Sequence, residues 1–155
     1  MISIRAATIS DLETLLPLVQ AYRVFYEQQP DPRRERDFIQ AHLQNATSHL
    51  FIALYNGETA GFMQLFTTHS TVYLGPALIL EDLFVAPAHR KHGVATALLA
   101  HAVEYARSTG ATGMFLETAY TNKTAQNVYE HAGWTRENRF YKYNAPLAVT
   151  APELM

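Results

Sequence analysis

Two apolar segments with a helical segment between them constrain the fold of this chain more than any other feature. The pattern predicts strands over Leu78–Val85 and Gly113–Thr118, and a helix that begins at Gly93 lies between them. A strand, a helix and a second strand of these lengths form a βαβ unit, whose two strands are parallel. We therefore expect a sheet that contains one parallel pair.

A further set of strands precedes this unit. Ile2–Ala6 alternates apolar and polar residues, which predicts a first strand. Leu50–Tyr55 and Thr59–Phe66 are joined at Asn56-Gly57, the sequence most typical of a two-residue hairpin. This pattern predicts a central antiparallel pair.

Capping residues and breaks predict the other helices. Ser10–Glu13 matches a capping box, so that a helix should begin at Asp11 and be kinked or divided by Pro17. A cap at Asp31 predicts a second helix to Leu43. Near the end of the chain we expect a helix over Lys123–His131 and closing strands at Trp134 and at Arg139–Tyr143.

The turn after the strand at Leu78–Val85 is suited to bind an anion. The first N–H groups of a helix have no partner within the helix, and the helix dipole adds positive charge there. Gly93 and Ala95 leave this backbone uncovered, and Arg90 and Lys91 bring positive charge. A phosphate group is therefore the expected ligand of the turn.

Composition excludes several classes of function. The chain has 155 residues, so it predicts one domain over residues 1–146 and a loose tail over 147–155. Its net charge of −2 gives no basic surface for nucleic acid or for anionic lipid. Cysteine is absent, which excludes disulfides and a cysteine nucleophile. No apolar segment has the length of a membrane span, so a cytoplasmic protein is expected.

Two motifs together resemble one family. Arg90-Lys91-His92-Gly93-Val94-Ala95 resembles the signature of the GNAT superfamily of acyl-CoA-dependent N-acyltransferases, which is Gln or Arg, two residues, Gly, one residue, and Gly or Ala. Asn122, Ala125, Tyr129 and Gly133 resemble its second motif on the helix after the next strand. With Leu80–Val85 and the opening at Ile4–Thr8, the resemblance covers nearly the whole chain.

The resemblance implies a fold and an assembly. It implies an α/β (α+β) GNAT fold with a mixed, mostly antiparallel sheet of six to seven strands, one splayed parallel pair and roughly four flanking helices. Leu80–Leu83 and Phe140–Tyr143 look most similar to the polyamine and thialysine acetyltransferases and to the small yeast-type enzymes assigned to histones and D-amino acids. These groups imply a homodimer that shares or exchanges its C-terminal strands.

The resemblance also implies that acetyl-CoA is the donor. The turn would bind its pyrophosphate, and backbone groups of Leu83 and Val85 would bind the pantetheine amides. Asn122 would bind the arm of the cofactor, although a plain helix cap is an equal alternative. The residues expected to contact the cofactor are Leu83, Phe84, Val85, Arg90, Lys91, His92, Gly93, Val94, Ala95, Thr96, Asn122 and Tyr129.

Two carboxylates and one phenol are the candidates for proton transfer. An alkylammonium is protonated at neutral pH and needs a base before it can attack. Glu81 is the first candidate, because a matching glutamate serves the polyamine group, and Asp82 is the second. Since side chains alternate along a strand, the two should point to opposite faces. Tyr129 is the candidate acid that protonates the departing thiolate.

The sequence therefore predicts an N-acetyltransferase that moves an acetyl group from acetyl-CoA to a small primary amine by direct attack. A CoA-binding regulator without catalysis and a transferase for protein N-termini are the alternatives. No metal is expected, because the seven histidines form no ligand motif. Tyr22, Phe25, Tyr26, Phe140 and Tyr141 are aromatic candidates for the acceptor walls, for a dimer face or for the core.

Overall fold

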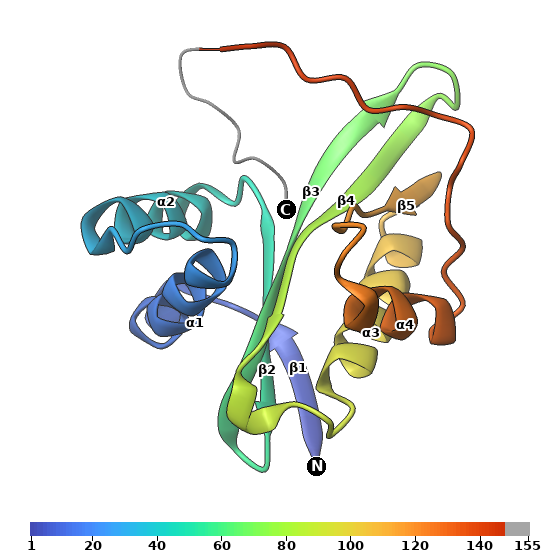
Figure 1. Cartoon of the computed structure of the whole chain (residues 1–155). Coiled ribbons are helices and arrows are strands. Elements are labelled where there is room, and N and C mark those ends of the chain that lie inside the picture. The colour runs from blue at the N-terminus through green and yellow to red at the C-terminus, as the bar shows by residue number, and fades with distance from the viewer. Residues whose placement is uncertain (148–155) are drawn as a thin grey trace. The chain divides into compact units, whose positions relative to one another are not determined.

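The computed structural model describes residues 1–147, which fall into two compact units, residues 1–116 and the residues from Glu117 onward (Figure 1). The strands are β1 (Ile2–Ala6), β2 (His49–Tyr55), β3 (Glu58–Ser70), β4 (Gly75–Val85) and β5 (Gly113–Phe115). The α-helices are α1 (Leu12–Phe25), α2 (Pro32–Asn45), α3 (Val94–Ser108) and α4 (Lys123–His131), with short 3-10 turns η1 (Ile9–Asp11) and η2 (Pro87–His89).

The five strands form one sheet in the order β1-β2-β3-β4-β5. The first four are antiparallel to their neighbours, and β4 and β5 are parallel. The predicted parallel pair is thus confirmed, and so is the hairpin at Asn56-Gly57, where both residues have positive φ as this turn requires.

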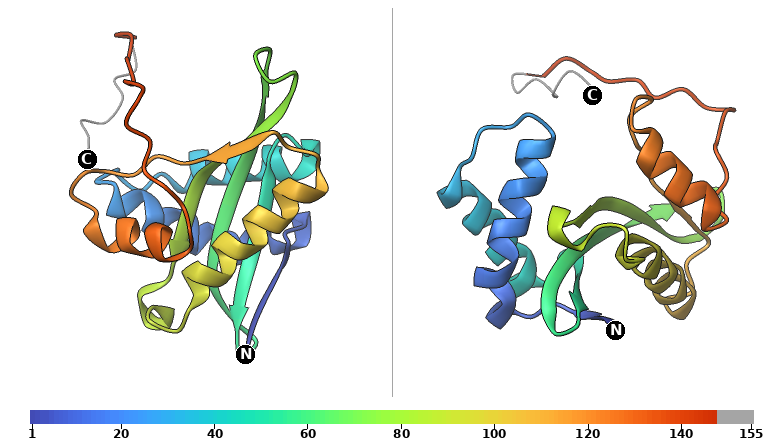
Figure 2. Two further views of the ribbon diagram at one scale, coloured as in Figure 1. Left: turned by 90° about the vertical axis from the view of Figure 1, so that its right-hand side faces the viewer. Right: turned by 60° about the horizontal axis from the view of Figure 1, so that its bottom comes forward.

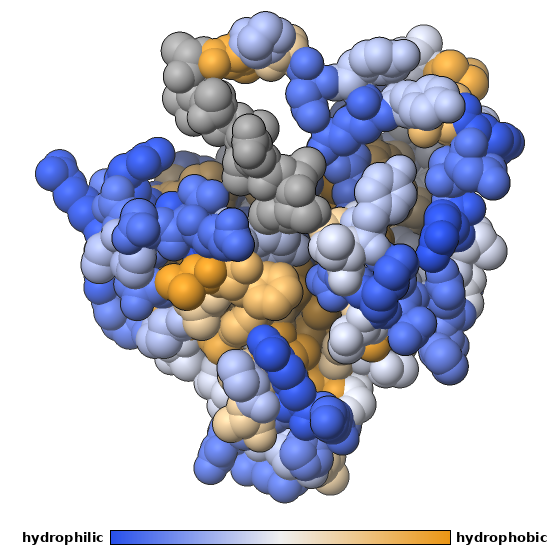
Figure 3. Space-filling model, in the orientation of Figure 1, coloured by the Kyte–Doolittle hydropathy of each residue, from blue (hydrophilic) through white to orange (hydrophobic). Residues whose placement is uncertain are grey.

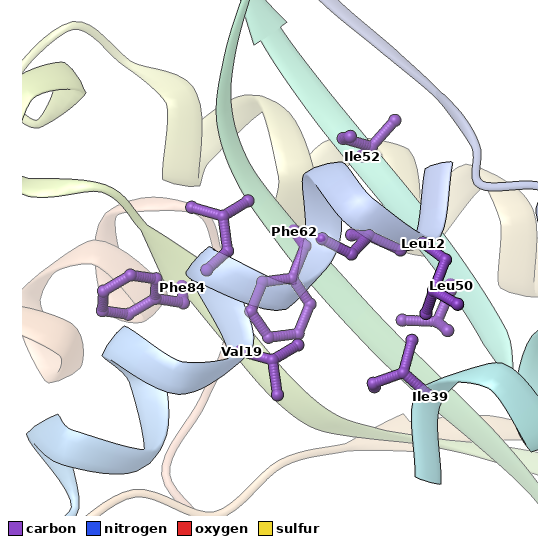
Figure 4. Packing of buried hydrophobic residues seen from close by; sticks show 9 residues of the cluster. Leu12, Val19, Ile39, Leu50, Ile52, Phe62 and Phe84 are labelled. Atoms are coloured by element: carbon purple, nitrogen blue, oxygen red, sulfur yellow. The ribbon is translucent and has the colours of Figure 1, made fainter. Parts of the chain in front are cut away.

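Helices cover both faces of the sheet. α1 and α2 lie on one face and α3 on the other (Figure 1; Figure 2). Figure 4 shows how side chains from α1, α2, β2, β3 and β4 meet in the first of these layers, among them Leu12, Val19, Ile39, Leu50, Ile52, Phe62 and Phe84. The face of α3 predicted to be buried is buried: Val94, Leu98, Leu99, Ala102 and Ala106.

The closing strands predicted at Trp134 and at Arg139–Tyr143 do not form, so that the described sheet has five strands and not six or seven. Arg139–Tyr143 has a strand-like composition, but its ring side chains are 76–90% exposed in Phe140, Tyr141 and Tyr143. Composition favours a strand only when one face packs on a core, which this segment lacks.

The start of the first helix also differs from the prediction. The capping box consists of Thr8 and Asp11, one turn is 3-10, and α1 begins at Leu12 and not at Asp11. Arg5 donates two hydrogen bonds of 2.8 Å to the carboxylate of Asp11, and the N–H of Thr8 donates a third at 2.8 Å. The side chain of Asp11 is thus directed toward Thr8. α1 is one helix with Pro17 inside it, so that of the two predicted effects of Pro17, a kink or a division, the division does not occur.

The second unit is organised around α4, whose predicted bounds are confirmed. Asn122 caps it by accepting a hydrogen bond of 3.2 Å from the N–H of Ala125. Gly133 follows its end with a φ of 91°. Lys142 donates to Glu117 within the same unit. The predicted loose tail, 147–155, lies outside the described residues except for Leu147.

Candidate active site

The middle of β4 is irregular opposite β3. Gln64 pairs with Asp82, but the next residue of β3, Leu65, pairs with Leu80. Glu81 is therefore an extra residue in β4, which is a β-bulge. Because paired residues share a face, Leu80 and Asp82 lie on opposite faces although they are two residues apart, and Asp82 shares the face of Gln64.

Hydrogen bonds fix the carboxylate of Asp82. The amide Nε2 of Gln64 donates to Asp82 Oδ2 at 2.9 Å, and Ser48 Oγ donates to Gln64 Oε1 at 2.7 Å. The phenol of Tyr22, on α1, also acts on Asp82 and lowers the pKa of its carboxyl. Gln64 is only 2% exposed, and this chain of bonds satisfies its amide in the interior. Asp82 is thus held between β3 and α1.

The surroundings of Asp82 favour its protonated form. Burial raises the pKa of this carboxyl above its usual value, and the charge of Glu81 adds to the increase. The hydrogen bond from Gln64 and the nearby phenol of Tyr22 lower the pKa, but their effect is weaker than that of burial. Burial also raises the pKa of the Tyr22 phenol, so that the phenol keeps its proton and acts as the donor. A carboxylate with a raised pKa is a better acceptor for the proton of an ammonium group.

Glu81, by contrast, is exposed at the bulge. A bulge interrupts the alternation of side chains from which opposite faces were predicted for Glu81 and Asp82. Glu81 and Asp82 are neighbours at the bulge in β4. Their burial differs, and of the two only Asp82 is held by neighbouring side chains that the structure records.

Over its last residues, one edge of β4 has no strand of residues 1–147 beside it. β5 pairs with β4 only from Ala77 to Ile79 and ends at Phe115, opposite Ile79. The N–H of Ala86 donates to the carbonyl of Ala60, towards β3, and backbone groups alternate sides along a strand. The backbone groups of Leu83 and Val85 therefore point to this unpaired edge, where the resemblance implies an amide-bearing ligand.

The turn from β4 into α3 exposes backbone N–H groups. The first N–H bonded within the helix is that of Ala97, which donates to the carbonyl of Gly93 at 3.0 Å. The three preceding N–H groups, of Val94, Ala95 and Thr96, thus have no partner in the helix. Gly93 has a φ of 85°, and Lys91 has a φ of 64° although it carries a side chain. A non-glycine residue in this region is strained, and such strain is typical of ligand-binding loops.

Arg90 connects this turn to the end of β4. Its Nε donates to the carbonyl of Val85 at 2.9 Å, and its guanidinium lies 5.4 Å from the ring centre of Phe84. That bond requires the Val85 carbonyl to point out of the sheet ladder. Lys91 and His92 are exposed, and the ring of His92 lies 4.8 Å from that of Tyr55.

The remaining candidates lie in the second unit. Asn122 acts as the cap of α4, which was one of its two predicted roles. Tyr129 lies on α4 with its ring 6.5 Å from that of Trp134. The roles of Asn122 and Tyr129 toward a cofactor stay predictions.

The strand edge, the bulge with its carboxylates and the turn into α3 lie in consecutive residues of one strand and one helix. The profile of the acetyltransferase (GNAT) family matches residues 13–134, which includes all three features. The chain belongs to the GNAT acetyltransferase family. The resemblance of its two motifs to that family is thereby confirmed, and so is the GNAT fold class.

Several relatives support the GNAT assignment. An uncharacterized N-acetyltransferase of Bacillus subtilis (strain 168), YhfO, is 39% identical over 91% of this chain and 95% of its own length. An aminoalkylphosphonate N-acetyltransferase of Salmonella typhimurium is 29% identical over 90% and 89%. The crystal structure of a probable acetyltransferase has a TM-score of 0.90 and 35% identity, covering 96% of this chain and 99% of its own. The chain is accordingly an acetyltransferase.

Two residues of this GNAT site were not singled out from the sequence, Gln64 and Ser48. A signal for Gln64 exists, because it is the one amide in the apolar segment Gly61–Phe66. Ser48 precedes β2 and gives no such signal. Among residues 1–147, no three His, Asp or Glu side chains gather so as to hold a metal ion. None of the described helices is long and apolar enough to cross a membrane.

Proposed function

We propose that this GNAT acetyltransferase moves an acetyl group from acetyl-CoA to the primary amine of a small molecule, such as an amino acid, a polyamine or a similar amine. The observation that carries the proposal is the turn into α3, where three free N–H groups follow directly on the free edge of β4. A pyrophosphate suits the former and an amide-bearing arm suits the latter. A relative that acetylates an aminoalkylphosphonate supports a small amine as the acceptor.

The donor site is built from backbone groups. The N–H groups of Val94, Ala95 and Thr96 bind the pyrophosphate, with the positive charges of Arg90 and Lys91 beside them. The backbone groups of Leu83 and Val85 hydrogen-bond to the amides of the pantetheine arm and so hold it along β4. Acetyl-CoA, when bound, supplies the acetyl group as an activated thioester.

A carboxylate of β4 removes the proton from the acceptor. Asp82 has the raised pKa and the fixed position that suit this role, and Glu81 is the second candidate, reversing the order expected from the family. The amine nitrogen then attacks the thioester carbon, which forms the amide and breaks the C–S bond. The proton lost by the amine resides on the carboxylate or on a water molecule bound to it.

Tyr129 is proposed as the acid that donates its phenolic proton to the sulfur as the C–S bond breaks. The second proton that the nitrogen loses as the amide forms passes through water to the phenolate and restores Tyr129. The chain has no cysteine, which fits direct attack without a cysteinyl intermediate. The homodimer and the cytoplasmic location expected from the sequence stay predictions.

The experiment is an amine screen in which release of the CoA thiol is measured with and without amine. We expect amine-dependent release, reduced about a hundredfold or more by Tyr129→Phe, because a general acid contributes at least this factor. An unchanged rate in that variant would refute the role of Tyr129. Tight acetyl-CoA binding with no turnover of any amine would favour the regulator, and turnover of peptides alone would favour a protein N-terminal transferase.

A further inference from the structure

The layer of α1 and α2 beside Asp82 has few free negative charges. Four of its acidic side chains lie against arginine: Asp11 on Arg5 at 2.8 Å, Glu13 on Arg36 at 2.6 Å, Asp31 on Arg34 at 3.9 Å and Glu35 on Arg23 at 2.6 Å. Asp37 lies in the field of Arg36. Glu27, exposed after the end of α1, is the remaining acid of this layer in the described chain.

Aromatic rings connect the surroundings of Asp82 to the exposed end of α1. The ring of Tyr22 lies 5.7 Å from that of Phe84 and 5.0 Å from that of Tyr26. Phe25 continues the series at 5.2 Å from Tyr26. We call these four residues the aromatic wall. Each pair meets edge to face, so the rings form one continuous apolar series that runs from Phe84, which is buried, through the half-buried Tyr22 and Tyr26 to the exposed Phe25.

The outer end of the aromatic wall is open to solvent. Phe25 is 54% exposed, and its neighbour Val24 is 50% exposed. Figure 3 shows an apolar area over the end of α1 and the adjoining part of the sheet, with polar surface around it. An exposed apolar patch with a polar rim is typical of a ligand-binding surface.

We infer that the acceptor is a monoamine with an aromatic or apolar body, which lies on the aromatic wall while its ammonium group lies at the carboxylates of Glu81 and Asp82. This inference rests on the proposed function and narrows its acceptor. It predicts that apolar amines are better acceptors than polyamines, although the sequence motifs resemble those of the polyamine acetyltransferases.

The same arrangement disfavours acceptors with several positive charges. A second ammonium placed on the aromatic wall loses hydration and finds four acids already paired with arginine, so that only Glu27 and Asp37 of this layer are available to it in the described chain. Discrimination then comes from the lack of counter-charges as much as from the apolar contact. The chain is therefore expected to prefer one ammonium group over three or four.

The test compares kcat/KM for 2-phenylethylamine, spermidine and an aminoglycoside at saturating acetyl-CoA, with thiol release as the readout. We expect kcat/KM for 2-phenylethylamine to exceed the values for spermidine and for the aminoglycoside at least about tenfold, since one well-placed apolar group gives discrimination of this order. Phe25→Ala should raise KM for 2-phenylethylamine about tenfold with little change in kcat.

Two variants are the controls. Phe38 on α2 has the same 54% exposure as Phe25, but its ring contacts His42, so Phe38→Ala should leave this KM unchanged. Glu27→Gln should also leave it unchanged. A higher kcat/KM for spermidine or the aminoglycoside, or an unchanged KM in Phe25→Ala, would overturn the inference but leave the proposed function standing. If no amine of any class is turned over, the proposed function fails, and this inference fails with it.

Discussion

At the scale of single residues, Asp82 is the candidate catalytic side chain that its neighbours hold in place and whose pKa its burial changes. A carboxylate in the middle of a sheet is costly unless hydrogen bonds satisfy it. Gln64 donates to it here, yet the pKa of Asp82 remains above its usual value because burial outweighs the effects of Gln64 and Tyr22. An ionised Asp82 therefore lowers the stability of the fold, which is expected of a residue kept for its chemistry.

Replacing Asp82 by asparagine should separate activity from stability. Asp82→Asn keeps the shape and removes the proton acceptor, so kcat/KM for an amine should fall about a hundredfold or more. A folded-state pKa raised above the unfolded value means that stability is lost as pH rises through the raised pKa. The variant, which has no charge to desolvate, should therefore have an equal or higher Tm at pH 7, measured by thermal unfolding.

The opposite pattern, a large drop in Tm with unchanged kcat/KM, would make Asp82 a structural residue and would transfer the role of base to Glu81 or to water. Glu81→Gln measured in parallel distinguishes these two, because Glu81 is exposed and its replacement should leave Tm unchanged.

Removing the hydroxyl of Tyr22 should change the pH dependence of the reaction. The phenol of Tyr22 lowers the pKa of Asp82, and Glu81 is the charged group of β4 that raises it. In Tyr22→Phe this pKa rises further, so the acidic limb of the kcat/KM profile should move to higher pH. The ring contacts of Tyr22 with Tyr26 and Phe84 are kept in the variant.

Tyr105→Phe is the matched control for Tyr22→Phe. Tyr105 lies on α3, on the other face of the sheet, and its hydroxyl is 2.8 Å from Nδ1 of His49. Its loss should lower stability by about 1 kcal/mol, as expected for one hydrogen bond, and leave the acidic limb in place. If both variants move the limb equally, the hydroxyl of Tyr22 has no special effect on Asp82.

At the scale of elements, the turn between β4 and α3 depends on the backbone of Gly93. A φ of 85° is readily adopted by glycine and is strained for other residues, while the space around a Cβ at Gly93 is open, with Ile2 Cδ1 at 3.8 Å. Substitution there disturbs the backbone and not the packing. The direction of the free N–H groups should change with it.

Gly93→Ala is therefore expected to raise KM for acetyl-CoA about tenfold. Gly110→Ala is the control, because Gly110 follows the end of α3 with a φ of 75°, and a Cβ at this position would meet no atom within 4 Å. Both variants should lose roughly 1 kcal/mol of stability from the strained backbone. Only Gly93→Ala should affect acetyl-CoA, as measured by titration calorimetry and by initial rates. An equal effect of both variants would refute the placement of the donor at this turn.

Local signals in the sequence were sufficient for most elements and failed where a distant contact intervened. Asn56-Gly57 fixed its hairpin and Asn122 fixed the start of α4, because each acts within a few residues. The capping box was misplaced because Arg5, six residues from Asp11, draws that carboxylate to Thr8. The bulge at Glu81 was not foreseen, because it depends on how β3 and β4 pair.

At the scale of the whole molecule, the order of strands and helices followed from the sequence, but the extent of the sheet did not. The parallel pair was expected from the length of its crossover, and the five-stranded order agrees with it. A closing strand was predicted at Arg139–Tyr143 and does not form, because pairing partners decide whether a strand forms. The chain of Ser48, Gln64 and Asp82 is likewise a product of tertiary structure, since its members come from separate parts of the chain.

The proposed function depends above all on one step, the direct transfer of an acetyl group from acetyl-CoA to an amine held at β4. The test uses acetyl-CoA labelled with carbon-13 in the acetyl group. The protein is incubated with it and with 2-phenylethylamine or another accepted amine, and mass spectrometry then follows the label in the small molecules and in the intact protein. We expect that the amine gains one labelled acetyl group, that the protein gains none at any time during turnover, and that Asp82→Asn reduces the product about a hundredfold or more. A labelled acetyl group on the protein that is then passed to the amine, or a complete absence of acetylated amine, would contradict it.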